Sequence, residues 1–194
     1  AVPQDLKFEG ENSLLEIGDH TIVREYCTLN RGTKASMTTK IGAHCLLMAY
    51  VHVAHDCFVG NHVILANNVN LAGHIDIGDH AILGGLTAVH QFVKIGAHVM
   101  VGGGSLVTKD IPPFAKAARE PLIYEGVNAI GLRRRGFQKE QIDRIHEIYR
   151  YLFIKYRNIT KAVNMIREEL PESEEKTVIL EFIQGSNRGI MKGH

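Results

Sequence analysis

Aliphatic side chains recur at every sixth residue from Ile41 to Val107, and this period restricts the fold of the chain more than any other feature. An α-helix turns through about 600° in six residues, which would spread these side chains over three faces. In an extended chain an even step keeps them on one face. A second period, of 18 residues, is set by the dipeptides Ile41-Gly42, Val59-Gly60, Ile77-Gly78 and Ile95-Gly96. Three short strands in each 18-residue coil predict a triangular solenoid with an aliphatic interior and coils about 4.8 Å apart.

The six-residue step is interrupted once near the start of the chain. Ile17, Val23 and Leu29 already follow it, but the segment 30–40, with Arg31-Gly32-Thr33, breaks the count by one hexad. We therefore expect an inserted loop there.

The step ends after Pro112-Pro113, where a different pattern takes over. Residues 138–156, 159–170 and 173–185 carry apolar side chains at the three- and four-residue spacings that are typical of helices. We predict a solenoid over residues 1–114 and a small α-helical C-terminal domain over residues 115–194.

The composition is that of a folded protein. Of 194 residues, 45% are hydrophobic and 22% charged, which excludes a disordered chain. No apolar run reaches the roughly 18 residues of a membrane span, and no signal-like segment opens the chain. It begins at Ala1, part-way through the pattern and without an initiator Met, so we expect a processed or truncated product. The net charge of +1 combines −3 over residues 1–114 with +4 over residues 115–194, which indicates two regions with different roles.

The three cysteines, Cys27, Cys45 and Cys57, all fall at an inward-facing position of the hexad. We expect them to be buried small hydrophobic residues. Three thiols without paired spacing indicate a reducing compartment, and so a cytoplasmic protein.

One group of histidines follows the repeat: His44, His62, His80 and His98 lie 18 residues apart, at one corner of successive coils. Solvated turn residues are the favoured interpretation of this column. A metal ladder is the alternative, and it needs further ligands and preorganised spacing.

A second group departs from the repeat. His55-Asp56, Gly73-His74 and Gln91-Phe92 occupy a different corner of three consecutive coils, with His90 and His52 near them in the sequence. Stacking is expected to bring His52, His55, His74 and His90 to one edge, within about 10 Å. Polar corner residues hydrated by water are one interpretation. The other is a catalytic cleft, in which one imidazole acts as a general base because its ordinary pKa lies near 6.5.

Several motifs together carry a family resemblance that runs nearly from end to end. They are His52-Val53-Ala54-His55-Asp56, Leu71-Ala72-Gly73-His74, Gln4-Asp5-Leu6-Lys7 and Arg134-Arg135-Gly136-Phe137. In them the chain resembles the acyl-[acyl-carrier-protein]–UDP-N-acetylglucosamine O-acyltransferases, which catalyse the first step of lipid A biosynthesis. The resemblance implies a left-handed parallel β-helix of hexapeptide repeats, a homotrimer, and acyl carrier protein and UDP-N-acetylglucosamine as substrates. It implies no cofactor, no metal, no nucleic-acid partner and no integral membrane segment.

The resemblance also implies roles for individual residues. His55 would be the general base for transfer of an (R)-3-hydroxyacyl group to the sugar 3-hydroxyl, with Asp56 beside it and the Gly73 N–H stabilising the oxyanion. Gly103 would leave the acyl groove long, for chains of about 14 carbons or more. Substrate contacts would come from Gln4, Asp5, Lys7, His52, His74, His90, Gln91, Asn128, Arg134 and Arg135. Ile130 stands where some members have an acidic residue.

Four alternatives remain open at this point. Some relatives accept a 3-amino sugar and form an amide. The later UDP-3-O-acylglucosamine N-acyltransferase shares the solenoid, but typically has an N-terminal uridine-binding domain. A zinc carbonic anhydrase would use His52, His55 and His74, although its usual ligand spacing is His-x4-His. The last alternative is a non-catalytic binding solenoid. Assays with both sugars, metal analysis and His55→Ala separate them.

Overall fold

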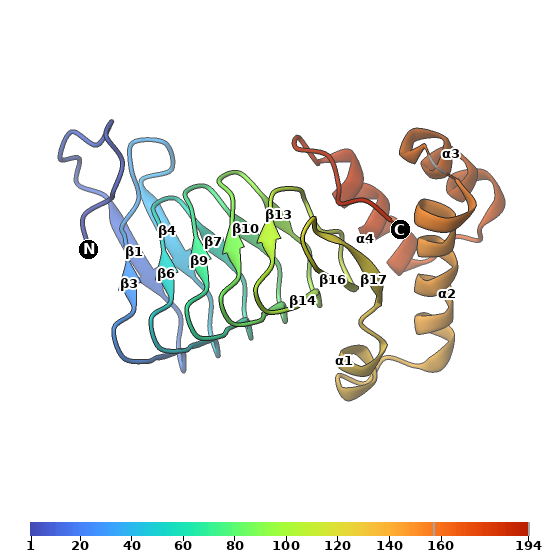
Figure 1. Ribbon diagram of the computed structural model, residues 1–194, viewed down its shortest axis with the longest axis horizontal. Coiled ribbons are helices and arrows are strands. Elements are labelled where there is room, and N and C mark those ends of the chain that lie inside the picture. Colours follow the sequence, from blue (N-terminus) through green and yellow to red (C-terminus); the bar gives the residue numbers. More distant parts are fainter. Residues whose placement is uncertain (157, 194) are drawn as a thin grey trace.

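The computed structural model describes residues 1–156 and 158–193, and its first two-thirds form a three-sided parallel solenoid (Figure 1). We name its faces sheets A, B and C. Sheet A contains β1 (Leu14–Ile17), β4 (Thr38–Ile41), β7 (Phe58–Val59), β10 (Asp76–Ile77) and β13 (Lys94–Ile95). Sheet B contains β2 (Ile22–Val23), β5 (Leu46–Leu47), β8 (Ile64–Leu65), β11 (Ile82–Leu83) and β14 (Met100–Val101). Sheet C contains β3 (Thr28–Leu29), β6 (His52–Val53), β9 (Asn70–Leu71), β12 (Ala88–Val89) and β15 (Leu106–Val107).

The strand register confirms the 18-residue period. Val59 pairs with Ile77 and Ile77 with Ile95, and the corresponding strands of sheets B and C pair in the same way. Each aliphatic column therefore points inward, and Leu47, Leu65 and Leu83 are fully buried. The hexapeptide solenoid is thus built by the alternation of inward aliphatic and outward side chains that the sequence shows.

The first coil is less buried than the pattern predicts. Ile17 and Val23 are 44% and 41% exposed, although they lie at inward positions. Cys45 and Cys57 are buried, but the prediction that Cys27 is buried is wrong, because it lies half-exposed. Within the described residues, β1 and β2 are the end strands of sheets A and B, so each pairs with a neighbour on one side only. All three thiols are free.

The helical part begins later than residue 115. Residues of β16 (Ala115–Ala118) pair with β14, and β17 (Ile123–Val127) pairs antiparallel with β16, so these residues extend sheet B. The region predicted as a helical domain therefore opens with a pair of strands that the sequence analysis did not anticipate, because the small side chains of Ala115 and Ala117 continue the inward pattern. The expected division of the chain near residue 115 remains an interpretation.

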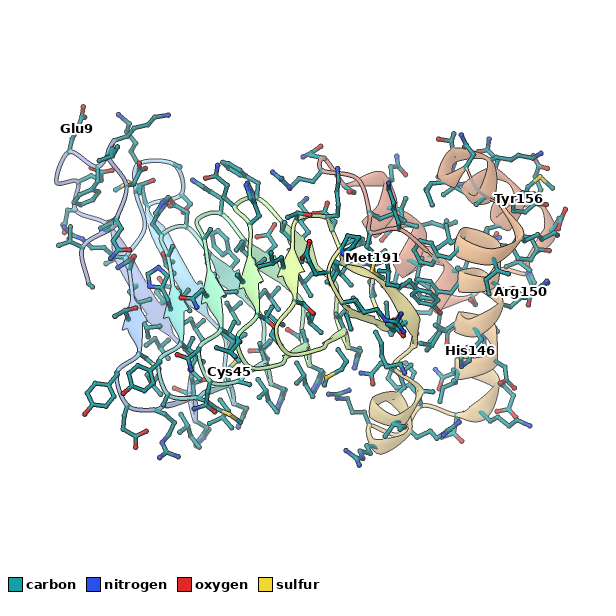
Figure 2. All side chains as sticks on the ribbon, in the orientation of Figure 1. Glu9, Cys45, His146, Arg150, Tyr156 and Met191 are labelled. Carbon is teal, nitrogen blue, oxygen red and sulfur yellow. The ribbon has the colours of Figure 1, made fainter. Side chains whose placement is uncertain are left out.

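Three helices fall in the predicted segments: α2 (Lys139–Arg150), α3 (Ile159–Glu169) and α4 (Glu174–Gln184), with a π-helical turn, η1 (Tyr151–Lys155), after α2. A short helix, α1 (Ala129–Arg134), precedes them and was not predicted. Asn158 and Ser173 cap α3 and α4 by accepting hydrogen bonds from backbone N–H groups. Figure 2 shows Tyr156 among the helices at one end of the molecule and Glu9 at the other end. Within the described residues, no helix has the length and apolar character needed to cross a membrane.

The column of corner histidines between sheets A and B is a stack of aromatic rings. His44, His62, His80 and His98 face one another at centroid separations of 4.6 to 4.9 Å, and each has a left-handed backbone conformation. The interpretation of solvated turn residues holds for the exposed His44 and His62, whereas His80 and His98 are half-buried. His98 also packs against Phe114 and Phe137. Because stacked rings do not converge their nitrogens on one point, this geometry does not favour the metal ladder.

We expect this stack to make the protein less stable in acid. Burial, with His80 and Arg135 adding repulsion, lowers the pKa of His98 from 6.5 to about 4. The unfolded chain therefore binds the proton first, so stability is complete above pH 6.5 and falls as the pH drops from 6.5 towards 4. The expected loss is about 2–3 kcal/mol.

His98→Asn tests this expectation, since Asn tolerates the left-handed conformation and does not titrate. Chemical unfolding at pH 7.5 and pH 5 should show a smaller pH-dependent loss for this variant. His146→Gln, on the exposed side of α2, is the matched control and should keep the wild-type loss. Equal losses in all three proteins would refute the assignment.

Candidate active site

Three consecutive coils place polar residues at the corner between sheets C and A, which we call the dyad corner. His55 and Asp56 follow β6, Gly73 and His74 follow β9, and Gln91 and Phe92 follow β12. The coils are joined directly there, since the His74 N–H donates to the His55 carbonyl oxygen at 3.1 Å. The 18-residue period therefore produces the predicted gathering of side chains.

His55 and Asp56 form a hydrogen-bonded pair. The His55 Nδ1 lies 2.8 Å from the Asp56 Oδ2, and the Asp56 side chain is fully buried while the His55 side chain is 13% exposed. Burial alone would raise the pKa of Asp56. Hydrogen bonds from Ser36, Thr33 and His55 outweigh it and hold that pKa well below its usual range. Asp56 is therefore a carboxylate at neutral pH, which favours a proton on Nδ1 of His55 and a free lone pair on Nε2.

Gly73 brings its backbone against the imidazole of His55. A β-carbon on residue 73 would lie 2.6 Å from the His55 Cε1 and 2.8 Å from its Nε2. Only glycine permits this approach. It places main-chain atoms beside the nitrogen that is free to accept a proton.

His74 completes the aromatic part of the corner. Its ring meets the His55 ring edge-on at 5.1 Å and stacks on Phe92 at 4.6 Å. The His74 Nε2 lies 3.9 Å from the Asp56 Oδ2, beyond hydrogen-bond distance. Phe92 thus fixes the orientation of His74 from the next coil.

A cleft of about 420 Å³ opens in front of the dyad. It is lined by Asp5, Lys7, Thr33, Lys34, Ala35, His55, His74, Gln91 and Phe92. A larger hollow of about 660 Å³ lies over sheet A, but its lining contains no histidine or cysteine. The smaller cleft is the one that combines a base, oriented donors and cations.

Comparisons with known proteins agree with this geometry. Residues 110–191 match the family described as Udp N-acetylglucosamine O-acyltransferase, Domain 2, and residues 38–73 match the bacterial transferase hexapeptide repeats. The acyl-[acyl-carrier-protein]–UDP-N-acetylglucosamine O-acyltransferase of Sulfurihydrogenibium sp. is 57% identical over 190 residues, which cover 97% of this chain and 70% of the relative. Its Aquifex aeolicus counterpart is 58% identical and covers 99% and 74%. This chain belongs to that O-acyltransferase family.

Solved structures place the whole described fold in the same O-acyltransferase family. The UDP-N-acetylglucosamine acyltransferase of Bacteroides fragilis has a TM-score of 0.97 at 47% identity, covering 99% of this chain and 75% of that one. The Acinetobacter baumannii protein has a TM-score of 0.93 at 44% identity, covering 98% and 75%. The N-acyltransferase alternative is therefore not favoured.

The structure gathers part of the predicted O-acyltransferase site at the dyad corner. Asp5, Lys7, His55, His74 and Gln91 line the cleft, and Asp56 and Gly73 lie directly behind it. Two predicted contacts lie outside the cleft lining: His52, whose Nδ1 is 2.7 Å from the Thr28 Oγ1 on sheet C, and the exposed His90. Gln4 is exposed and does not line it either.

The other predicted residues lie at the two remaining corners. Asn128 donates to the His98 carbonyl oxygen at 2.9 Å, and Arg135 donates to the His80 carbonyl oxygen at 3.1 Å, so both lie beside the histidine stack. Arg134 is exposed in α1 nearby, and Gly103 lies at the corner between sheets B and C. Within a single chain, these residues therefore lie at different corners of the solenoid from His55.

The zinc alternative finds no support in this arrangement. Among the described residues, one group of three side chains has potential metal-ligating atoms within 4.8 Å of one another: His55, Asp56 and His74. The proposed zinc set required His52, which contacts Thr28 instead. Three of the four hydrogen bonds to the Asp56 carboxylate come from Thr33 and Ser36, which further favours a structural anion over a metal ligand.

Proposed function

We propose that this protein transfers an (R)-3-hydroxyacyl group from acyl carrier protein to the 3-hydroxyl of UDP-N-acetylglucosamine, the first step of lipid A biosynthesis. The relatives at 57% and 58% identity are named acyl-[acyl-carrier-protein]–UDP-N-acetylglucosamine O-acyltransferases, which supports the donor, the acceptor and the ester product. The observation that carries the proposal is the His55–Asp56 pair: His55 lines the cleft, and the Gly73 backbone packs against its Nε2 edge.

The geometry fits acyl transfer with His55 as the base. The Nε2 of His55 takes the proton of the sugar hydroxyl as its oxygen attacks the thioester carbonyl carbon. The resulting tetrahedral intermediate loses the carrier thiolate as the carbon–sulfur bond breaks, and the proton passes from Nε2 to that sulfur. A positioned base contributes about 10²- to 10⁴-fold to such a step.

The Gly73 N–H is the proposed donor to the oxyanion. A backbone donor beside the reacting carbon costs no reorganisation when the charge develops, and one such donor is worth about 10²- to 10³-fold. Asp5, Lys7, His74 and Gln91 are the proposed sugar and phosphate contacts within the cleft.

A homotrimer is the proposed assembly. Asn128, Arg134 and Arg135 belong to a different corner of the chain from His55, so they reach a substrate at His55 only from a neighbouring copy. His52, His90 and Gln4 also remain proposed substrate contacts.

The charge of the C-terminal region fits the proposed acyl donor. The net charge of +4 over residues 115–194 suits an acidic carrier protein. The free thiols suit the cytoplasm, which is the proposed location.

Incubation with 3-hydroxymyristoyl carrier protein and UDP-N-acetylglucosamine tests the function. Mass spectrometry should find one acyl group on the sugar, in an ester that mild alkali cleaves. A 3-amino analogue as sole acceptor, giving an alkali-stable amide, would instead support the amide-forming alternative. Failure to acylate either sugar would contradict the proposal.

Gly103→Met is expected to shorten the preferred acyl chain. A β-carbon at residue 103 would lie 3.0 Å from the Gly85 carbonyl oxygen, so a side chain fits after a small shift and then fills the groove. Competition between carrier proteins loaded with 10- to 16-carbon chains measures the preference. Unchanged selectivity would refute the assignment of Gly103 as the chain-length determinant.

A further inference from the structure

The loop that interrupts the hexad repeat closes over the dyad corner. Residues 30–37 connect β3 to β4, and within them the Met37 N–H donates to the Thr33 carbonyl oxygen at 2.7 Å. Gly32 packs so closely on the strand after the loop that a β-carbon there would lie 2.3 Å from the Thr38 nitrogen. Thr33 is 4% exposed. The loop is therefore held in place by hydrogen bonds of its own backbone and by bonds to residues 11–14, such as the Gly32 N–H donating to the Leu14 carbonyl oxygen.

Two side chains of the loop, Thr33 and Ser36, donate hydrogen bonds to the Asp56 carboxylate. The Thr33 N–H donates to the Asp56 Oδ1 at 2.9 Å, and the Thr33 hydroxyl donates to Oδ2 at 2.6 Å. The Ser36 hydroxyl donates to Oδ1. With Nδ1 of His55, the two carboxylate oxygens receive four hydrogen bonds, which is their full capacity.

The charge of Asp56 has no lysine or arginine partner. Among the described residues, the ion-pair contacts of Asp56 are with His55 at 2.8 Å and His74 at 3.9 Å. A fully buried carboxylate without a fixed cation is unfavourable unless neutral donors replace its water. The N–H and hydroxyl donors of Thr33 and Ser36 replace that water. Because they carry no charge, they do not cancel the negative charge of Asp56.

We propose that Thr33 and Ser36 are positioning residues for the acyl transfer: they keep Asp56 ionised, so that it holds His55 with Nδ1 protonated and stabilises the imidazolium formed when Nε2 takes the sugar proton. This role rests on the proposed function. A lysine in the place of Thr33 or Ser36 could not serve this role, because its permanent positive charge would oppose the positive charge that develops on His55.

Four variants test this role. Thr33→Val and Ser36→Ala remove one hydroxyl each with little change in shape, and the double variant removes both. Thr33→Ser keeps the hydroxyl and should restore activity. Thr21→Val is the matched control, because the Thr21 hydroxyl donates to the Gly42 carbonyl oxygen at the corner between sheets A and B.

We expect kcat to fall about tenfold for each hydroxyl removed, with KM for UDP-N-acetylglucosamine nearly unchanged. Losing a donor raises the pKa of Asp56, because the hydrogen bonds from Thr33 and Ser36 help to hold it low, so the acid limb of kcat/KM should move to higher pH. A purely structural role would lower the melting temperature and leave the acid limb in place, and that result would overturn the proposal. If the double variant fails to fold, the two single variants decide by the same criteria.

Nitrogen-15 NMR of the histidine rings gives a readout that does not depend on turnover. In the wild-type protein at pH 8, His55 should carry its proton on Nδ1, and the double variant should show a mixture of tautomers. A wild-type His55 protonated on Nε2 would overturn the positioning role. A wild-type protein that shows the expected tautomer but transfers no acyl group would refute the proposed function alone.

Discussion

Replacing His55 by alanine is expected to lower kcat by about 10²- to 10⁴-fold, with a much smaller effect on the KM for UDP-N-acetylglucosamine. The imidazole is 13% exposed and lines the cleft, so its removal takes away the proposed base without disturbing the buried core. Steady-state kinetics with purified acyl carrier protein measure the change.

His62→Ala is a matched control for the histidine substitution, because His62 belongs to the exposed part of the ring stack at a different corner. It should retain most of the wild-type kcat. A loss of only a few-fold in His55→Ala would end the assignment of His55 as the general base, whatever the effect of the control.

The second large effect is expected from a single methyl group at Gly73. In Gly73→Ala the β-carbon must occupy space 2.6 to 2.8 Å from ring atoms of His55, so either the imidazole or the Gly73 backbone has to move. Displacements of this size at a reacting group commonly cost about 10²-fold in rate. We expect that loss in kcat, with a folded protein and a normal melting temperature.

Gly185→Ala controls for the general effect of adding a methyl group to a glycine. A β-carbon there would approach its nearest neighbour, the Glu181 carbonyl oxygen, at 3.4 Å, which is an ordinary contact. Its kcat should equal the wild-type value. Near-normal turnover in Gly73→Ala would mean that this backbone does not border the reacting atoms.

The solenoid could be predicted from the sequence because the six-residue repeat shows which side chain of every strand points inward. Ile41, Val59, Ile77 and Ile95 pair in register as their spacing requires. The exceptions lie where stacking stops: in the outermost coil Ile17 is exposed and Cys27 only partly buried, and Ala115 continues a sheet after the aliphatic pattern has ended. The exposure in the outermost coil and the extra strand at Ala115 do not depend on the local sequence alone. Each is decided by whether another segment of the chain packs alongside.

The dyad corner was predictable for the same reason that the strands were. His55, Gly73 and Gln91 are each 18 residues apart, so the coils must stack them. His52 and His90 were expected there through closeness in sequence, but a strand directs each side chain by its position in the pleat, and His52 points to the outer face of sheet C beside Thr28. Closeness in sequence is a poor guide across a strand.

Thr33, Ser36 and Phe92 were not identified as site residues from the sequence. The break in the hexad marks the place of the loop, but its fold depends on backbone contacts such as Gly32 against Thr38, which no period encodes. Phe92 carries a usable signal, because it lies one coil beyond His74 and two beyond Asp56. Asn128, Arg134 and Arg135 entered through family resemblance, and their distance from His55 within one chain follows only from the three-sided shape.

A crystal structure of this protein with UDP-N-acetylglucosamine tests the central claim most directly. We expect the sugar in the cleft at the dyad corner, with its 3-hydroxyl oxygen about 2.6–3.2 Å from the His55 Nε2. A nucleotide sugar bound with that hydroxyl turned away from His55, or bound at another corner, would contradict it.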